Sequence, residues 1–119
     1  MAISARQAAK ILATESGFTL SNLQIQKILY ISHMTYMYRN DGVESPLVLE
    51  QFEAWDFGPV VPTLYRELKC FGAKPVENIV RRTSIASVHD DQEGMLKRAV
   101  ARFANARPGY LVELTHRAG

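Results

Sequence analysis

The amino-acid sequence predicts a mostly α-helical α+β fold, in which a compact helical bundle surrounds a central apolar helix and carries a small β-hairpin. The strongest observation is the stretch from residue 22 to residue 38, where Lys27 is the only charged residue and apolar side chains point in nearly every direction. A helix that is apolar all round is normally the one that other helices surround. Two further observations support this fold class: helix-start signals recur along the chain, and a strand-like alternation leads into a Gly-Pro turn.

The length of 119 residues suits one domain, residues 1–119, with one hydrophobic core. With 47% hydrophobic and 22% charged residues, the composition excludes disorder as the main state. The net charge of +2 is too small to indicate a nucleic-acid or membrane partner. No run approaches about 18 consecutive apolar residues, so we expect no membrane span. The single cysteine, Cys70, excludes an internal disulfide and suits a reducing compartment, so we expect a cytoplasmic protein.

Two helices begin with the same local signal. Ser4 precedes Gln7 by three residues, and Ser21 precedes Gln24 by three, a spacing that lets each pair satisfy free backbone donors at a helix start. Gly17 supplies a left-handed stop for the first helix. The second helix should run to about residue 39 and form the centre of the bundle.

The middle of the chain predicts a strand, a corner and a third helix. Polar and apolar residues alternate in the later part of residues 47–55, as in a short strand, although residues 47–49 suit a helical turn equally well. Residues 56–59 read as a turn, and Pro62 suits the first position of a helix that Gly72 ends.

The later half predicts weak extended pieces followed by two helices. Residues 76–79 and 84–88 could form a second hairpin arm. Asp90 and Glu93 have the capping spacing, and a short final helix is expected over residues 110–116 after a Pro-Gly break. The helix after Asp90 should bury one arc of apolar residues: Met95, Leu96, Ala99, Val100 and Phe103.

Catalytic and metal-binding patterns are lacking. Cys70 has no nucleophile motif around it and is expected to be a buried structural cysteine. His33, His89 and His116 lie far apart, with no pair at helical spacing. No Gly-rich loop precedes a helix in the arrangement that cradles phosphate. We therefore expect no enzyme, no metal and no cofactor.

A nucleic-acid role is the alternative that the basic residues suggest. The first two helices resemble a helix-turn-helix in outline, but the second offers few polar groups for base edges, so core packing suits it better. A basic set remains in the later half of the chain. The candidates for nucleic-acid contact in that half are Arg81, Arg82, Arg98 and Arg102.

The run FEAWDFGPVVPTLYREL, residues 52–68, is the most informative stretch. Its aromatic residues and prolines either complete the core around a sharp strand-to-helix corner or form a rigid edge that docks a partner, with Trp55 or Tyr65 as the anchor. Both can hold at once. The candidate partner-binding residues are Trp55, Asp56, Phe57, Gly58, Pro59, Tyr65 and Arg66.

This run and the helical stretch LQIQKILYISHMTY, residues 23–36, resemble the Panacea domain, a SocA-like antitoxin domain also known as a phage-associated protein domain. Family members carry a K-[IL]-L-Y-x-[AS] helix and then an acidic-Ala-Trp-x-x-Gly-Pro-Val-x-Pro-x-[LI]-Tyr run. LTH at residues 114–116 resembles the closing motif, which in the family commonly continues to a Pro-Trp pair, whereas this chain ends at Gly119. The matching positions are Lys27, Leu29, Tyr30, Ala54, Trp55, Gly58, Pro59, Val60, Pro62 and Tyr65.

The resemblance implies a small, non-enzymatic antitoxin of a bacterial or prophage toxin-antitoxin pair, which acts by direct contact with its cognate toxin protein. Some members of the family are also linked to delivery of a toxin to a protease. The alternative is a DNA-binding regulator that uses the Arg-rich later half. The sequence leaves open the identity of the toxin, the binding surface and the oligomeric state.

Overall fold

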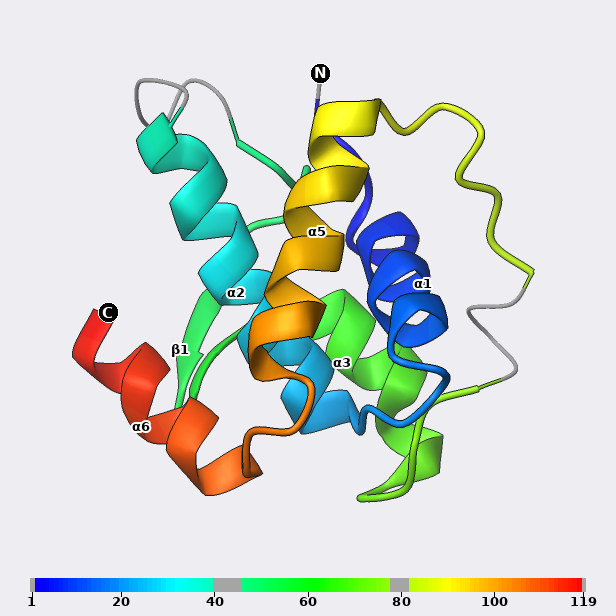
Figure 1. Ribbon diagram of the computed structural model, residues 1–119. Helices are drawn as coiled ribbons and strands as arrows, with labels where there is room; N and C mark the ends of the chain where they lie inside the picture. The colour runs from blue at the N-terminus through cyan, green and yellow to red at the C-terminus, as the bar shows by residue number, and fades with distance from the viewer. Residues whose placement is uncertain (1, 40–45, 78–81, 119) are drawn as a thin grey trace.

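A computed structural model describes residues 2–39, 46–77 and 82–118 of the chain. It confirms a mostly α-helical fold with one small antiparallel sheet (Figure 1). The elements in chain order are α1 (Ala5–Glu15), α2 (Asn22–Arg39), β1 (Glu53–Trp55), β2 (Gly58–Val60), α3 (Pro62–Leu68), the 3-10 turn η1 (Lys69–Phe71), α5 (Asp90–Phe103) and α6 (Pro108–Ala118).

Helix α2 is the central helix, as the sequence predicts. It contacts α1, α3, α5, α6 and β2, and Figure 1 shows α5 crossing in front of it with α1 and α6 on opposite sides. Ile25, Ile28 and Leu29 are fully buried in the core. Because five elements pack around α2, a single apolar stripe could not cover all of these contacts. This explains why apolar residues occur on nearly every side of the helix.

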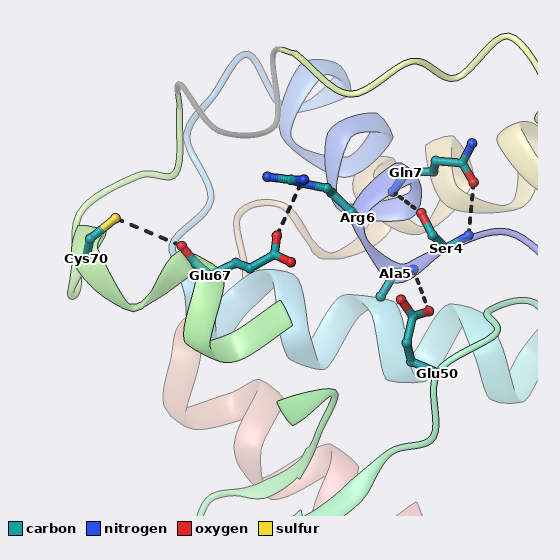
Figure 2. A network of polar contacts seen from close by, with 7 residues as sticks. All are labelled: Ser4, Ala5, Arg6, Gln7, Glu50, Glu67 and Cys70. Carbon is teal, nitrogen blue, oxygen red and sulfur yellow. Dashed lines mark hydrogen bonds and ion pairs between the residues drawn. The ribbon is translucent and has the colours of Figure 1, made fainter. Parts of the chain in front are cut away.

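The helix starts of α1 and α2 confirm both predicted capping pairs. At α1, the Ser4 backbone N–H donates to Oε1 of Gln7 (2.9 Å), and the Gln7 N–H donates to Oγ of Ser4 (3.0 Å) (Figure 2). The Ser21 N–H likewise donates to Gln24 (2.9 Å), whose N–H donates back (3.3 Å). Gly17 follows α1 with a positive φ of 72°, the left-handed stop that was expected.

The turn of the hairpin is shorter than predicted. Glu53 pairs with Val60 and Trp55 with Gly58, so only Asp56 and Phe57 form the turn, and the expected four-residue turn over 56–59 is wrong. A two-residue connection lets the strand pairing continue to the residue directly after the turn. Residues 47–49 form neither a helical turn nor part of β1, because this stretch forms an isolated parallel bridge to Ile3 instead.

Helix α3 begins at Pro62 and buries Leu64 and Leu68. The 3-10 turn η1 continues it, and Gly72, with a φ of 59°, ends the pair as predicted. Cys70 was expected to be buried but is exposed, since η1 turns this side chain outward with its Sγ 4.0 Å from the Glu67 carbonyl (Figure 2). Glu67 also forms an ion pair with Arg6 across to α1 (3.2 Å).

The later half holds three corrections. Residues 73–77 and 82–88 contain no strand, so the described part of the chain shows no second hairpin arm, while residues 78–81 lie outside the described residues. The cap of α5 is shifted by one position: the His89 N–H donates to Oε1 of Gln92 (3.0 Å), in place of the expected Asp90 and Glu93 pair. Helix α6 begins at Pro108 instead of residue 110, because a proline lacks only a donor that is free at that position anyway.

Helix α5 buries the apolar arc that its periodicity predicts and leaves its basic residues exposed. Within the described ranges, no helix is both long enough and apolar enough to cross a membrane.

Candidate protein-binding site

Polar side chains of the otherwise apolar helix α2 hold the corner between β2 and α3. Oε1 of Gln26 accepts a hydrogen bond from the Val61 backbone N–H (2.9 Å), and its Nε2 donates to Oδ1 of Asn22 (3.1 Å). Nδ2 of Asn22 donates in turn to the Tyr65 carbonyl (3.2 Å). Asn22 and Gln26 are both buried, so these bonds fix the corner on the central helix.

Lys27 is the second tether and is fully buried. Its Nζ donates to the Pro59 carbonyl (2.7 Å) and lies 5.4 Å from the centroid of the Phe57 ring, within reach of a cation–π interaction. Within the described residues it forms no ion pair with a carboxylate, and burial lowers its pKa to about 8. A buried lysine of α2 therefore holds the backbone of β2 against the central helix.

Gly58 sits directly over this lysine. Its φ is 100°, and an added Cβ would lie 3.1 Å from both Nζ of Lys27 and Oγ1 of Thr115 on α6. The Thr115 hydroxyl donates to the Leu111 carbonyl (2.9 Å), which fixes the side chain against its own helix. A side chain at residue 58 would therefore be disfavoured for a conformational and a steric reason.

Three aromatic rings from the hairpin and α3 form one cluster. The ring centroids of Trp55 and Tyr65 are 5.0 Å apart, those of Phe57 and Tyr65 are 5.8 Å apart, and those of Trp55 and Phe57 are 6.1 Å apart. Each ring is half-buried, and Nε1 of Trp55 donates to Glu53 (3.1 Å). We call these three rings the aromatic cluster.

The structure thus brings the predicted partner-binding residues together at one corner, which we call the hairpin site. Asp56 at the turn and Arg66 on α3 are exposed, and Pro59 is half-buried. Gly58 is buried, so its place in the site is to shape the corner. The seven residues of the hairpin site are Trp55, Asp56, Phe57, Gly58, Pro59, Tyr65 and Arg66.

Two hollows flank the aromatic cluster. One of about 430 Å³ is lined by Trp55 together with Tyr30, Phe52 and Thr115, among others. The other, of about 480 Å³, is lined by Phe57 and Tyr65 together with Lys69 of η1, the two residues that follow η1 and the start of α2. Hollows of this size can accept bulky side chains of a partner protein on either side of the rings.

The candidates for nucleic-acid contact lie elsewhere. Arg98 and Arg102 are exposed one turn apart on α5, and Arg82 is exposed in the segment before it. Arg81 lies outside the described residues. Gln26 and Lys27 are two of the few polar side chains that α2 has to offer to base edges, and both are buried, so α2 presents no recognition face there.

His33 and His89 serve separate local roles. Nδ1 of His33 accepts a hydrogen bond from the Val48 N–H (3.4 Å), its ring lies 5.1 Å from that of Phe52, and burial lowers its pKa. His89 caps α5. Among the residues that the structure describes, no three His, Cys, Asp or Glu side chains gather as a metal site would require.

Sequence reasoning identified the hairpin residues but missed the tethers beneath them. Lys27 was the one signal that could have revealed them, because a lone charge in an apolar helix must find a polar partner when it is buried. Its partner, the Pro59 carbonyl, lies 32 residues further along the chain.

Comparisons with known proteins match most of the chain. The family model described as "Antitoxin SocA-like, Panacea domain" matches residues 25–119, which include the hairpin site and α6. Antitoxin SocA of Caulobacter vibrioides is 29% identical over 130 residues, which cover 98% of this chain and 67% of that protein. No solved structure matches the chain.

Proposed function

Because the chain belongs to the SocA-like family of Panacea-domain antitoxins, we propose that it neutralises a cognate toxin by direct protein–protein binding at the hairpin site. The aromatic cluster carries this proposal. Trp55, Phe57 and Tyr65 are half-buried, mutually packed and flanked by two hollows, a pattern typical of an interface anchor.

The rigidity of the corner supports the same role. The hydrogen bonds of Asn22, Gln26 and Lys27 with the backbone of residues 59–65 fix the corner that carries the rings before any partner binds. An ordered site loses little conformational entropy on binding, so more of the contact energy appears as affinity. Asp56 and Arg66 supply exposed charges of both signs for a polar rim.

The proposed activity is non-enzymatic and takes place in the cytoplasm. The toxin is held in a complex that survives moderate salt, because apolar anchors lose little to ionic screening. The resemblance to this family also implies that some members deliver a bound toxin to a protease. If this chain does so, the toxin will disappear faster in cells that contain the antitoxin than in cells without it.

The test is co-expression with the neighbouring small reading frame in the source genome. We expect that frame to be toxic alone, tolerated with this protein, and co-purified with it. Phe57→Ala should restore toxicity and lose the complex. Arg107→Glu changes an exposed residue outside the hairpin site and serves as the control that keeps both.

The proposal fails if no neighbouring product is toxic and no protein co-purifies. It also fails if Phe57→Ala, with an intact thermal melt, still neutralises the toxin as well as the control does.

A further inference from the structure

A groove of about 370 Å³ lies between α2 and α5, which run in opposite directions (Figure 1). Its floor is apolar, with Ile31 from α2 and Met95, Ala99 and Phe103 from α5. No residue that lines this groove lines either hollow at the hairpin site. The groove is therefore a separate feature of the surface.

Three arginines border the groove. Arg98 and Arg102 lie one turn apart on α5, and Arg39 comes from the last turn of α2. All three are exposed, and none forms an ion pair with a carboxylate of the described ranges. We call this feature the arginine groove.

Neighbouring Lys97 shows the contrast. Its Nζ pairs with Glu93 on the same helix (3.1 Å) and lies 4.0 Å from Glu15 of α1. Arg98 and Arg102 instead place two like charges at helical i, i+4 spacing, an arrangement that disfavours an isolated helix. The Arg102 guanidinium lies 5.3 Å from the centroid of the Phe103 ring, but neither arginine has a carboxylate partner among the described residues. Both charges are therefore available to carboxylates of a partner.

The apolar surface continues beyond the groove. Met34 is 39% exposed and Tyr38 is 88% exposed, and both lie three residues from groove-lining residues of α2, Ile31 and Thr35. Residues at this spacing are neighbours on a helix surface. An exposed apolar strip beside a cationic border is typical of an interaction surface.

We propose that the arginine groove binds an acidic amphipathic segment of a partner protein. Apolar side chains of the segment enter the floor between Ile31 and Phe103, and its carboxylates pair with Arg39, Arg98 and Arg102. A groove at the small end of the usual range for binding pockets takes one or two bulky side chains.

The apolar floor favours a protein over a nucleic acid. Phosphates would satisfy the three arginines but leave the floor and Tyr38 uncovered. The net charge of +2 also gives no broad basic field of the kind that nucleic-acid binders use. The inference does not depend on the hairpin site, because the two surfaces share no residue.

Fluorescence anisotropy with three labelled peptides and one duplex tests this inference on the full chain. The probe is a synthetic amphipathic peptide of glutamate and leucine, compared with one analogue that has glutamine for glutamate and another that has serine for leucine. We expect the first peptide to bind and each analogue to bind about tenfold more weakly, because each lacks one of the two contacts. A labelled DNA duplex should bind more weakly than the first peptide.

A charge-matched pair of variants locates the binding. Arg98→Glu with Arg102→Glu should weaken the first peptide by about tenfold or more. Lys74→Glu with Arg107→Glu makes the same change in net charge at exposed residues outside the groove and should leave binding within about twofold.

Failure of the first peptide to bind the wild-type chain overturns the inference, as does an equal loss in both double variants. Tighter binding of the duplex, lost on reversal of Arg98 and Arg102, would make the groove a nucleic-acid surface instead.

Discussion

The first half of α2 faces the hairpin site and the second half borders the arginine groove, and the two halves differ in how their polar groups are paired. Asn22, Gln26 and Lys27 are buried, and each forms a hydrogen bond with the backbone of residues 59–65 at the corner between β2 and α3. Arg39, near the other end, is exposed and has no carboxylate partner among the described residues, and the same holds for Arg98 and Arg102 across the groove.

Polar residues therefore have two different roles in the two halves of α2. Buried polar groups are costly unless they are hydrogen-bonded, so those beneath the hairpin serve to fix one geometry. Exposed cations beside apolar surface contribute little to folding and remain available to a partner. Substitutions in the two halves of α2 should therefore divide into effects on stability and effects on binding.

The largest effect on stability is expected between the two regions, at Leu29 of α2. This side chain is fully buried, and Leu29→Ala should leave a cavity and lower the free energy of unfolding by about 2 to 5 kcal/mol. Urea denaturation followed by circular dichroism measures the change. An unchanged midpoint would show that α2 is not the centre of the core.

A somewhat smaller effect is expected at the hairpin. Gly58→Val places a β-branched residue at a φ of 100° and brings its Cβ against Lys27 and Thr115. Strain of this kind costs on the order of 1 to 3 kcal/mol. Gly17→Val provides a matched control for the conformational part alone, since its φ is also positive but no atom lies within 4 Å of an added Cβ.

Gly58→Val should therefore lower the melting temperature more than Gly17→Val does. Equal shifts would mean that Lys27 and Thr115 move aside without cost.

The buried lysine predicts a pH dependence of stability. Burial lowers the pKa of Lys27 from 10.5 to about 8, so between these values the unfolded chain holds a proton that the folded chain has released. The free energy of unfolding from this group therefore rises as the pH increases from about 8 to 10.5, by on the order of 3 kcal/mol.

Lys27→Met removes this contribution. Denaturation of both proteins at several pH values across that interval should show a steeper rise for the wild type. Parallel curves would contradict the lowered pKa of Lys27.

The smallest effect on stability is expected at the groove. Arg98→Ala with Arg102→Ala should change the free energy of unfolding by no more than about 1 kcal/mol, because both side chains are exposed, neither has a carboxylate partner among the described residues, and the contact of Arg102 with the Phe103 ring lies at the surface. Thermal melts measure this, with Arg107→Ala as the reference. A loss comparable to that of Gly58→Val would assign these arginines to the fold and not to a partner.

Local signals explain which parts of the fold could be predicted. The caps at Ser4 and Ser21 depend on residues three positions apart, and the apolar arc of α5 depends on helical periodicity, so both are visible in the sequence. The cap of α5 was misplaced by one residue because His89, Asp90, Gln92 and Glu93 offer two overlapping pairs with the same spacing.

The remaining features depend on contacts between distant segments. The hairpin residues were recognised by their composition, but the contact of Gly58 with Lys27 and Thr115 joins three elements that no local pattern connects. The arginine groove likewise needs α2 and α5 side by side. Periodicity shows which face of a helix is buried but not which element covers it.

Affinity for the cognate toxin, measured by isothermal titration calorimetry, tests the central claim most directly. Phe57→Ala should weaken binding by about 30-fold or more, as truncation of an interface anchor does, while Arg107→Glu should leave it unchanged. Equal affinities of Phe57→Ala and wild type, with both proteins folded, would contradict neutralisation through the hairpin site.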